Sequence, residues 1–186
     1  VGYAEAPFAE QDTVHDGSGQ SMPLEYDNTQ SPYYAETERR FDEAQDWTRA
    51  GIKALTLYFY GDSENGHADQ LYVALKDSQG HTATVAYDGD TNHIAEALWH
   101  EWNIDLQAFA GIDLDQVARI CLGVGDRDNP QAGGTGIVFI DSIQLYGARC
   151  VATQAPAGDV NGDCVVDEED IAALSDDWLK AYTAVE

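Results

Sequence analysis

The sequence predicts an all-β fold, an antiparallel jelly roll or β-sandwich, followed by a small calcium loop and a helix. Three observations lead to this prediction. About eight short segments between residues 22 and 146 have the length and composition of strands. Loops rich in Gly, Asn, Asp and Pro separate them, as turn geometry requires. Long amphipathic helices, which a parallel sheet needs between its strands, are missing from this region.

The strand segments alternate between an aliphatic and an aromatic or polar side. In chain order they are MPLEYD, YYAETERRF, KALTLYFYG, QLYVALKD, HTATVAYD, WHEWNIDL, QVARICLGV and GTGIVFIDSIQLY. In the third segment, Leu55, Leu57 and Phe59 share one side, and the same alternation recurs in residues 71–76 and 99–106. The aliphatic sides are therefore predicted to form a core between two sheets.

The end of the β region is marked by residues 148–158, which carry small residues and a proline without a periodic pattern. This indicates a linker between a β domain, residues 1–147, and a C-terminal module, residues 159–186. Within the module, residues 168–182 are predicted to form a helix because Ile171, Leu174 and Trp178 recur with helical spacing. We expect this apolar stripe to hold the helix by docking.

Residues 159–170, DVNGDCVVDEED, predict a calcium-binding loop of the EF-hand type. Calcium takes oxygen ligands, which such loops supply from positions 1, 3, 5, 7, 9 and 12. Here those positions are Asp159, Asn161, Asp163, the carbonyl of Val165, Asp167 and Asp170. Two positions depart from the usual pattern: Cys164 replaces the glycine of the sharp turn, and position 12 is Asp instead of Glu. Val166, at position 8, is expected to turn inward.

The segment GDVNGDCVVDEEDIAALSDDWL closely resembles one repeat of a type I dockerin, in which Asp takes position 12. Dockerins that bind cohesins have two such repeats, and this sequence shows one. The resemblance therefore implies a calcium-stabilised tail, or half of an intermolecular pair, and puts cohesin binding in doubt.

The three cysteines are Cys121, Cys150 and Cys164. Cys121 lies in the apolar run ARICLGVG and is predicted to be a buried free thiol. A disulfide between Cys150 and Cys164 is the favoured pairing; it would close a loop of about 15 residues and contribute about 3 kcal/mol in the chain-entropy model. Such a bond implies an oxidising, extracellular setting. The two other pairings stay open.

The charge is strongly negative, with 34 acidic residues against 9 basic ones and a formal net charge of −25. Nucleic-acid phosphates and anionic membranes would be repelled, which excludes both as partners. Divalent cations would be attracted, although the acidity is equally consistent with a role in solubility alone. No run of about 18 apolar residues predicts a transmembrane helix. No signal-peptide pattern opens the chain, so Val1 is expected to be a processed or trimmed start.

Residues 20–146 resemble the galactose-binding-like jelly rolls found among carbohydrate-binding modules of secreted bacterial proteins. The resemblance rests on the order of SMPLEYD, DWTRAGIKALTLYFYG, LYVALKDSQG, WHEWNIDLQAFAGIDLDQV and IVFIDSIQLY. It implies a β-sandwich, a structural calcium ion with Asp141 as a candidate ligand, and a glycan-binding face. It also implies that the first strand of such a domain is missing or supplied otherwise.

Given this resemblance, the aromatic and polar sides of the strands are candidates for the glycan-binding face. Sugars stack their CH faces on aromatic rings while polar side chains bind their hydroxyls. The expected ligand-binding residues are Tyr58, Tyr60, Tyr72, Trp99, Glu101 and Arg119, with Lys76 as a further polar companion. The alternative, given equal weight, is that these aromatic rings cover a second packing surface.

No catalytic constellation is expected. The histidines, at positions 15, 67, 81, 93 and 100, are scattered without the spacing of a zinc site, and no serine lies in a nucleophile-elbow pattern. We therefore predict a secreted, non-catalytic, calcium-binding protein with a carbohydrate-binding-type sandwich, located outside the cell or on its surface. The alternative is a structural subunit of an extracellular, calcium-dependent surface layer or filament, in which chains form homo-oligomers by strand addition.

Overall fold

Each of the eight segments predicted as strands forms a strand. The computed structural model describes residues 2–15, 17–66, 69–149, 156–160 and 164–177. The strands are β1 (Met22–Asp27), β2 (Tyr34–Gln45), β3 (Ala54–Tyr60), β4 (Leu71–Asp77), β5 (Thr82–Ala86), β6 (Trp99–Asp105), β7 (Val117–Gly125) and β8 (Thr135–Tyr146). The strand positions predicted from the hydrophobic alternation therefore agree closely with those in the structure.

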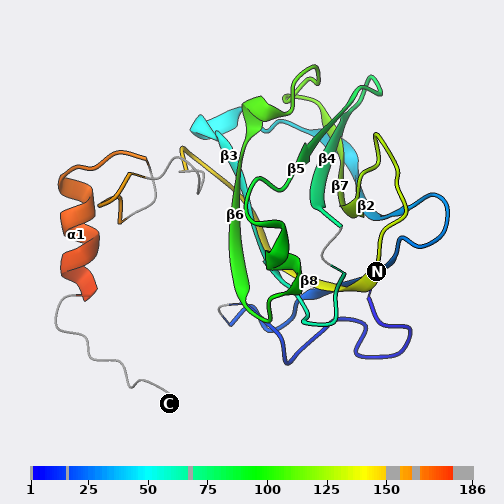
Figure 1. Ribbon diagram of the computed structural model, residues 1–186. Helices are drawn as coiled ribbons and strands as arrows, with labels where there is room; N and C mark the ends of the chain where they lie inside the picture. The colour runs from blue at the N-terminus through cyan, green and yellow to red at the C-terminus, as the bar shows by residue number, and fades with distance from the viewer. Residues whose placement is uncertain (1, 16, 67–68, 150–155, 161–163, 178–186) are drawn as a thin grey trace, which may run out of the picture.

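The strands form two four-stranded antiparallel sheets that face each other (Figure 1). Sheet 1 has the order β1-β8-β3-β6, and sheet 2 has the order β2-β7-β4-β5. Most neighbours within a sheet are distant in the sequence, so long-range pairing defines the fold. The predicted all-β antiparallel sandwich is confirmed.

One core fills the space between the sheets. Leu55, Leu57 and Phe59 of β3 are buried on its inner side, as predicted, and belong to the same cluster as Val73 and Leu75 of β4. Because a one-residue slip would turn all of these side chains outward, burial of this side fixes the register. Cys121, on β7, is a buried free cysteine, as predicted.

A buried polar network joins the turn after β1 to the loops before β4 and β8. Asp69 is 3% exposed, and its Oδ1 accepts a hydrogen bond from Nδ2 of Asn28 at 2.8 Å. Its Oδ2 accepts the N–H of Gly134 at 2.7 Å. A Cβ atom at Gly133 would come within 2.1 Å of Asp69 Oδ1, so only glycine allows this close approach. The network thus links these loops at one end of the sandwich.

Short 3₁₀ helices connect several strands: η1 (Arg49–Gly51), η2 (Thr91–Ala95) and η3 (Leu106–Ala108). Asp90 begins η2 because its side chain accepts the N–H of Asn92 at 2.9 Å, which satisfies one of the free donors of the first turn. Within the described residues, no helix has both the length and the apolar character needed to span a bilayer.

The C-terminal helix α1 (Glu168–Asp177) begins where it was predicted to begin. The remainder of the predicted helix, including Trp178, lies outside the described residues, as does most of the predicted linker. Ile171 and Leu174 are 70% and 48% exposed. The prediction that this stripe docks is therefore wrong for the described residues, because no described strand or loop covers it.

Candidate functional site

Four of the predicted ligand-binding residues come together on the outer side of sheet 1. Tyr58 and Tyr60 lie on β3, opposite Glu101 and Trp99 of β6. The rings of Tyr60 and Trp99 are 5.4 Å apart between centroids, and burial and the nearby Glu101 raise the pKa of Tyr58. We call these four residues the aromatic platform.

The prediction that Tyr72 and Arg119 share this face is wrong, because β4 and β7 belong to sheet 2. Tyr72 is only 1% exposed, and its hydroxyl donates to Glu36 at 2.9 Å. Its ring lies over Gly123, where a Cβ atom would come within 2.3 Å of it. Tyr72 therefore has a packing role, which was the alternative interpretation for these aromatic residues.

The aromatic platform is covered by the segment before β1. His15 stacks on Tyr58 with 3.7 Å between ring centroids and lies 5.4 Å from the Trp99 ring. The backbone N–H of His15 donates to Oδ2 of Asp141 at 2.9 Å, and the hydroxyl of Ser18 donates to the same oxygen at 2.6 Å. A sugar ring could reach the Tyr58 face only if this segment moved. Calcium ligation by Asp141 stays a prediction.

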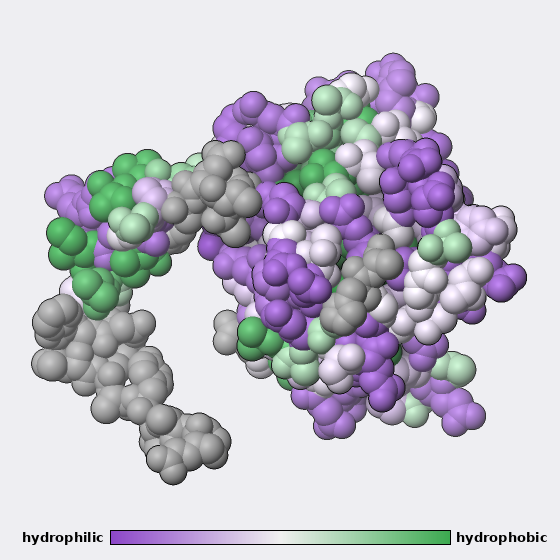
Figure 2. Space-filling model, in the orientation of Figure 1, coloured by the Kyte–Doolittle hydropathy of each residue, from purple (hydrophilic) through white to green (hydrophobic). Residues whose placement is uncertain are grey.

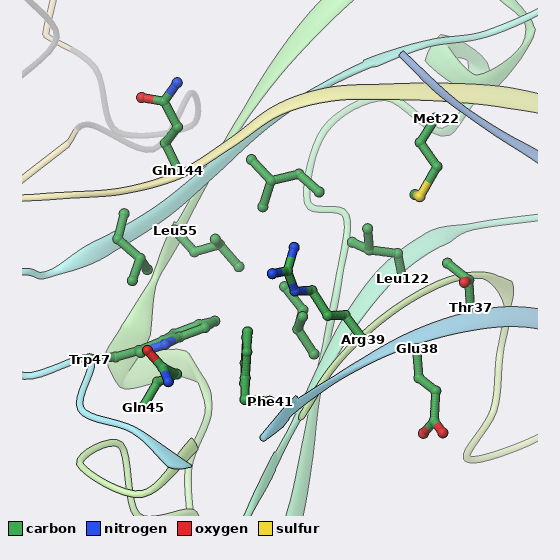
Figure 3. A pocket seen from close by; sticks show the side chains of 13 residues that line it. Met22, Thr37, Glu38, Arg39, Phe41, Gln45, Trp47, Leu55, Leu122 and Gln144 are labelled. Carbon is green, nitrogen blue, oxygen red and sulfur yellow. The ribbon is translucent and has the colours of Figure 1, made fainter. Parts of the chain in front are cut away.

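A pocket of about 540 Å³ opens beside the edge strand β2, between the two sheets (Figure 3). Its walls combine apolar side chains from both sheets with two aromatic rings. Phe41 and Trp47 stand edge to face, with 6.3 Å between ring centroids. The apolar lining residues are Met22, Phe41, Trp47, Leu55, Ile120, Leu122, Ile143 and Leu145. This cavity lies within the size range of small-molecule sites.

The polar side chains that line the pocket are Thr37, Glu38, Gln45, Gln144 and Arg39, of which Arg39 is positively charged. Arg39 lies on the inner side of β2, opposite Ile120, and yet it is exposed because β2 is the edge of sheet 2. Figure 3 shows its guanidinium reaching between the aliphatic side chains and Phe41, 5.8 Å from the centroid of that ring. Among the described residues it forms no ion pair. In so acidic a chain, a cation without an ion pair in the described part is available to a ligand.

Sequence reasoning missed this pocket, although one signal was present. Along β2, the inner side carries Ala35, Thr37, Arg39 and Phe41, so a charged residue interrupts the apolar side. Such a residue marks a place where the core is open to solvent, since a buried unpaired charge is too costly.

The described residues of the C-terminal loop fit a calcium ion. Cys164, at the glycine position, has a φ of 70°, the left-handed conformation that the sharp turn requires. Its N–H donates to Oδ2 of Asp159 at 2.8 Å. Asp170 is buried, and its oxygens accept the N–H groups of Val160 and Asp167 at 2.6 and 2.7 Å. The carboxylates at the two ends of the loop thus both accept backbone N–H groups of the loop, and calcium ligation by them stays a prediction.

Other predictions for this loop are untested or wrong. Asn161, Asp163 and Cys150 lie outside the described residues, so their ligand and disulfide roles stay predictions. The same holds for the carbonyl of Val165 as a ligand. Val166 is 55% exposed, so the prediction that it turns inward is wrong; the described part of the chain holds no second loop to cover it.

His93 and His100 come together, which corrects the view that the histidines are scattered. Their rings stack with 4.0 Å between centroids and 11° between planes. Glu96 lies beside them, with Oε2 3.2 Å from Nε2 of His100. Sequence spacing alone does not show this, because the chain turns between η2, which holds His93, and β6, which holds His100.

No protein-family model and no curated protein matches the chain. Solved structures match it in fold. A family 30 carbohydrate-binding module has a TM-score of 0.55 at 14% identity, over 82% of this chain and 79% of that one. The family 30 module of a cellulosomal cellulase from Clostridium thermocellum has a TM-score of 0.53 at 13% identity, over 74% and 80%.

An exo-β-agarase is also similar, with a TM-score of 0.57 at 15% identity, over 77% of this chain. This chain corresponds to only 22% of the agarase. At such low identities the likeness is one of fold, and it shows that this β-sandwich is the one on which these carbohydrate-binding modules are built.

Proposed function

We propose that the sandwich is a non-catalytic carbohydrate-binding module that binds a polysaccharide outside the cell, in the pocket beside β2. The observation that carries this proposal is the guanidinium of Arg39, which forms no ion pair with the residues that the structure describes, in a largely apolar pocket with two aromatic rings in its walls. Sugars need both parts: apolar surface for their CH faces and fixed polar groups for their hydroxyls. The fold likeness to family 30 modules, which it matches over most of their length, supports the same function.

The net charge narrows the ligand class to neutral polysaccharides. A protein with a formal charge of −25 repels polyanions at a distance, so sulfated or uronate-rich chains would approach it slowly. Hydroxyl pairs of a neutral sugar suit the guanidinium of Arg39, whose donors form a planar fork.

Arg39→Ala is expected to weaken binding of a neutral soluble polysaccharide about tenfold, because a hydrogen bond from a charged donor contributes about 1.5–3 kcal/mol. Affinity electrophoresis across a panel of neutral β-glucans and agarose oligosaccharides measures this. The matched control is Arg40→Ala, on the outer side of the same strand, where Arg40 pairs with Glu38. Wild-type binding by Arg39→Ala, together with loss of binding by Tyr58→Ala, would move the site to the aromatic platform.

We further propose that the C-terminal loop holds calcium as a fixed clamp through Asp159, Asn161, Asp163, Val165, Asp167 and Asp170. Its support is the left-handed turn at Cys164 and the buried carboxylate of Asp170. The ion would neutralise part of the negative charge of the loop and connect the start of the loop to the first turn of α1. Calcium binding would thereby stabilise the C-terminal module.

A calcium-dependent assembly of identical chains is the second candidate function. Figure 2 shows apolar surface concentrated on the C-terminal module, where the exposed apolar residues are Val160, Val165, Val166, Ile171 and Leu174. Two such modules would cover each other's apolar residues. Light scattering is expected to show larger particles in calcium than in EGTA, and to lose this difference in an Ile171→Asp, Leu174→Asp variant. Equal particle size in calcium and EGTA would remove this candidate.

A further inference from the structure

A second group of metal-binding side chains lies away from the pocket and the C-terminal loop. His93 is on η2, Glu96 follows it, and His100 is on β6. One ligand atom from each residue lies within 4.8 Å of the other two. Two imidazoles and a carboxylate are a ligand set typical of zinc sites, unlike the all-oxygen sets that calcium prefers.

His100 has a buried ring nitrogen beside Glu96. Its side chain is 11% exposed, and its Nε2 atom is buried without a well-directed hydrogen bond, although Glu96 Oε2 lies 3.2 Å away. A buried polar atom without a well-directed hydrogen bond is uncommon and calls for an explanation.

His93 is oriented by a hydrogen bond of its own. Its Nδ1 lies 2.7 Å from the hydroxyl of Tyr87, which is itself buried. In the tautomer whose Nδ1–H donates to this hydroxyl, Nε2 of His93 has the free lone pair. Metal-binding histidines usually have such an outer partner, which fixes the tautomer and the ring plane.

The backbone holds the three residues on a fixed frame. The carbonyl of Glu96 accepts the N–H of Gly61 at 3.1 Å, and the carbonyl of Ile94 accepts Nδ2 of Asn65 at 2.7 Å. A Cβ atom at Gly61 would come within 2.2 Å of the Ile94 carbonyl oxygen, so this loop and the end of β3 are in tight contact. The ligand-bearing backbone is therefore already in place.

We propose that His93, Glu96 and His100 bind a divalent transition metal ion, of which zinc is the best match. The ion would join the loop after η2 to strand β6, and water would complete its coordination. The ring of His100 would turn out of the stacked arrangement, while Tyr87 holds the ring of His93, so that the two lone pairs converge on the ion. The side chain of Glu96 is half-exposed, so its carboxylate is able to move toward the ion. The acidic surface raises the local concentration of cations.

Calorimetric titration of the full chain with zinc chloride, with calcium in excess to occupy the C-terminal loop, tests this proposal. We expect one zinc ion per chain, and at least about tenfold weaker binding in His93→Gln, His100→Gln and Glu96→Gln. Tyr87→Phe removes only the outer partner and is expected to weaken binding about tenfold. Cobalt provides a second readout, because its visible absorption reports tetrahedral coordination.

His81→Gln is the matched control, since His81 pairs with Asp77 on a different turn. Asp159→Ala controls for the C-terminal loop, and both controls are expected to bind zinc like the wild type. Near-UV circular dichroism checks that each variant is folded. If a histidine variant is not folded, the Glu96→Gln variant decides the test, because the side chain of Glu96 is half-exposed and its replacement disturbs packing less. Zinc binding that persists in all three ligand variants, or is lost in Asp159→Ala, would overturn the proposal, as would no binding by the wild type.

Discussion

Asp159→Ala is expected to abolish calcium binding by the C-terminal loop and to remove the protection that calcium gives the tail. Asp159 supplies the first ligand position, and it also accepts the N–H of Cys164 at the sharp turn. When free calcium is 100 times the dissociation constant, the bound ion stabilises the module by about 2.7 kcal/mol, all of which the variant would lose.

Limited proteolysis in calcium and in EGTA measures this effect directly. The wild-type tail should resist cleavage in calcium and lose that resistance in EGTA, whereas Asp159→Ala should be cleaved equally fast in both. Glu168→Ala is the matched control, because it removes an acidic residue of the same loop at a position that supplies no ligand. If Asp159→Ala kept calcium-dependent protection, the assignment of the loop would be wrong.

Asp69→Ala is expected to destabilise the sandwich by about 3 kcal/mol. It removes the acceptor for the Asn28 side chain and for the N–H of Gly134 at a site that is 3% exposed. Each buried donor left unsatisfied costs about 1–3 kcal/mol, while relief from burying the carboxylate offsets part of the loss.

Urea unfolding gives the comparison, with the midpoint and slope measured for both proteins. Asp88→Ala is the control, since Asp88 is exposed and its removal should change the free energy of unfolding by less than about 0.5 kcal/mol. A loss below about 1 kcal/mol in Asp69→Ala would mean that water replaces the carboxylate without penalty, and that apolar packing alone closes this end of the sandwich.

Strand positions could be predicted from the sequence because each strand carries its own alternation. Alternation shows which residues share a side of one strand, but it does not show which strands share a sheet. Tyr58 and Tyr72 each lie on the side of their strand opposite the aliphatic residues, yet β3 and β4 lie in opposite sheets. Sheet membership depends on pairing between distant segments, such as β2 with β7, which no local pattern encodes.

The candidate sites were predictable to different degrees for the same reason. The calcium loop is contiguous, so its ligand positions could be counted along the chain. The pocket needs Arg39 of β2 and Leu55 of β3 to meet across the two sheets. The histidine pair needs the turn of η2, which depends on the cap formed by Asp90. Both arrangements exist only once the chain has folded.

The segment that covers the aromatic platform belongs to the folded domain although it precedes the first strand. Among its described residues, the regular structure is a single bridge between Glu10 and Ser21, so a domain boundary drawn from strands would fall just before β1. A protein shortened to that boundary would leave the carboxylate of Asp141 without its two donors from this segment, and it would bare the ring of Tyr58 to water. These residues pack against the outer side of sheet 1, and any recombinant fragment of the sandwich should retain them.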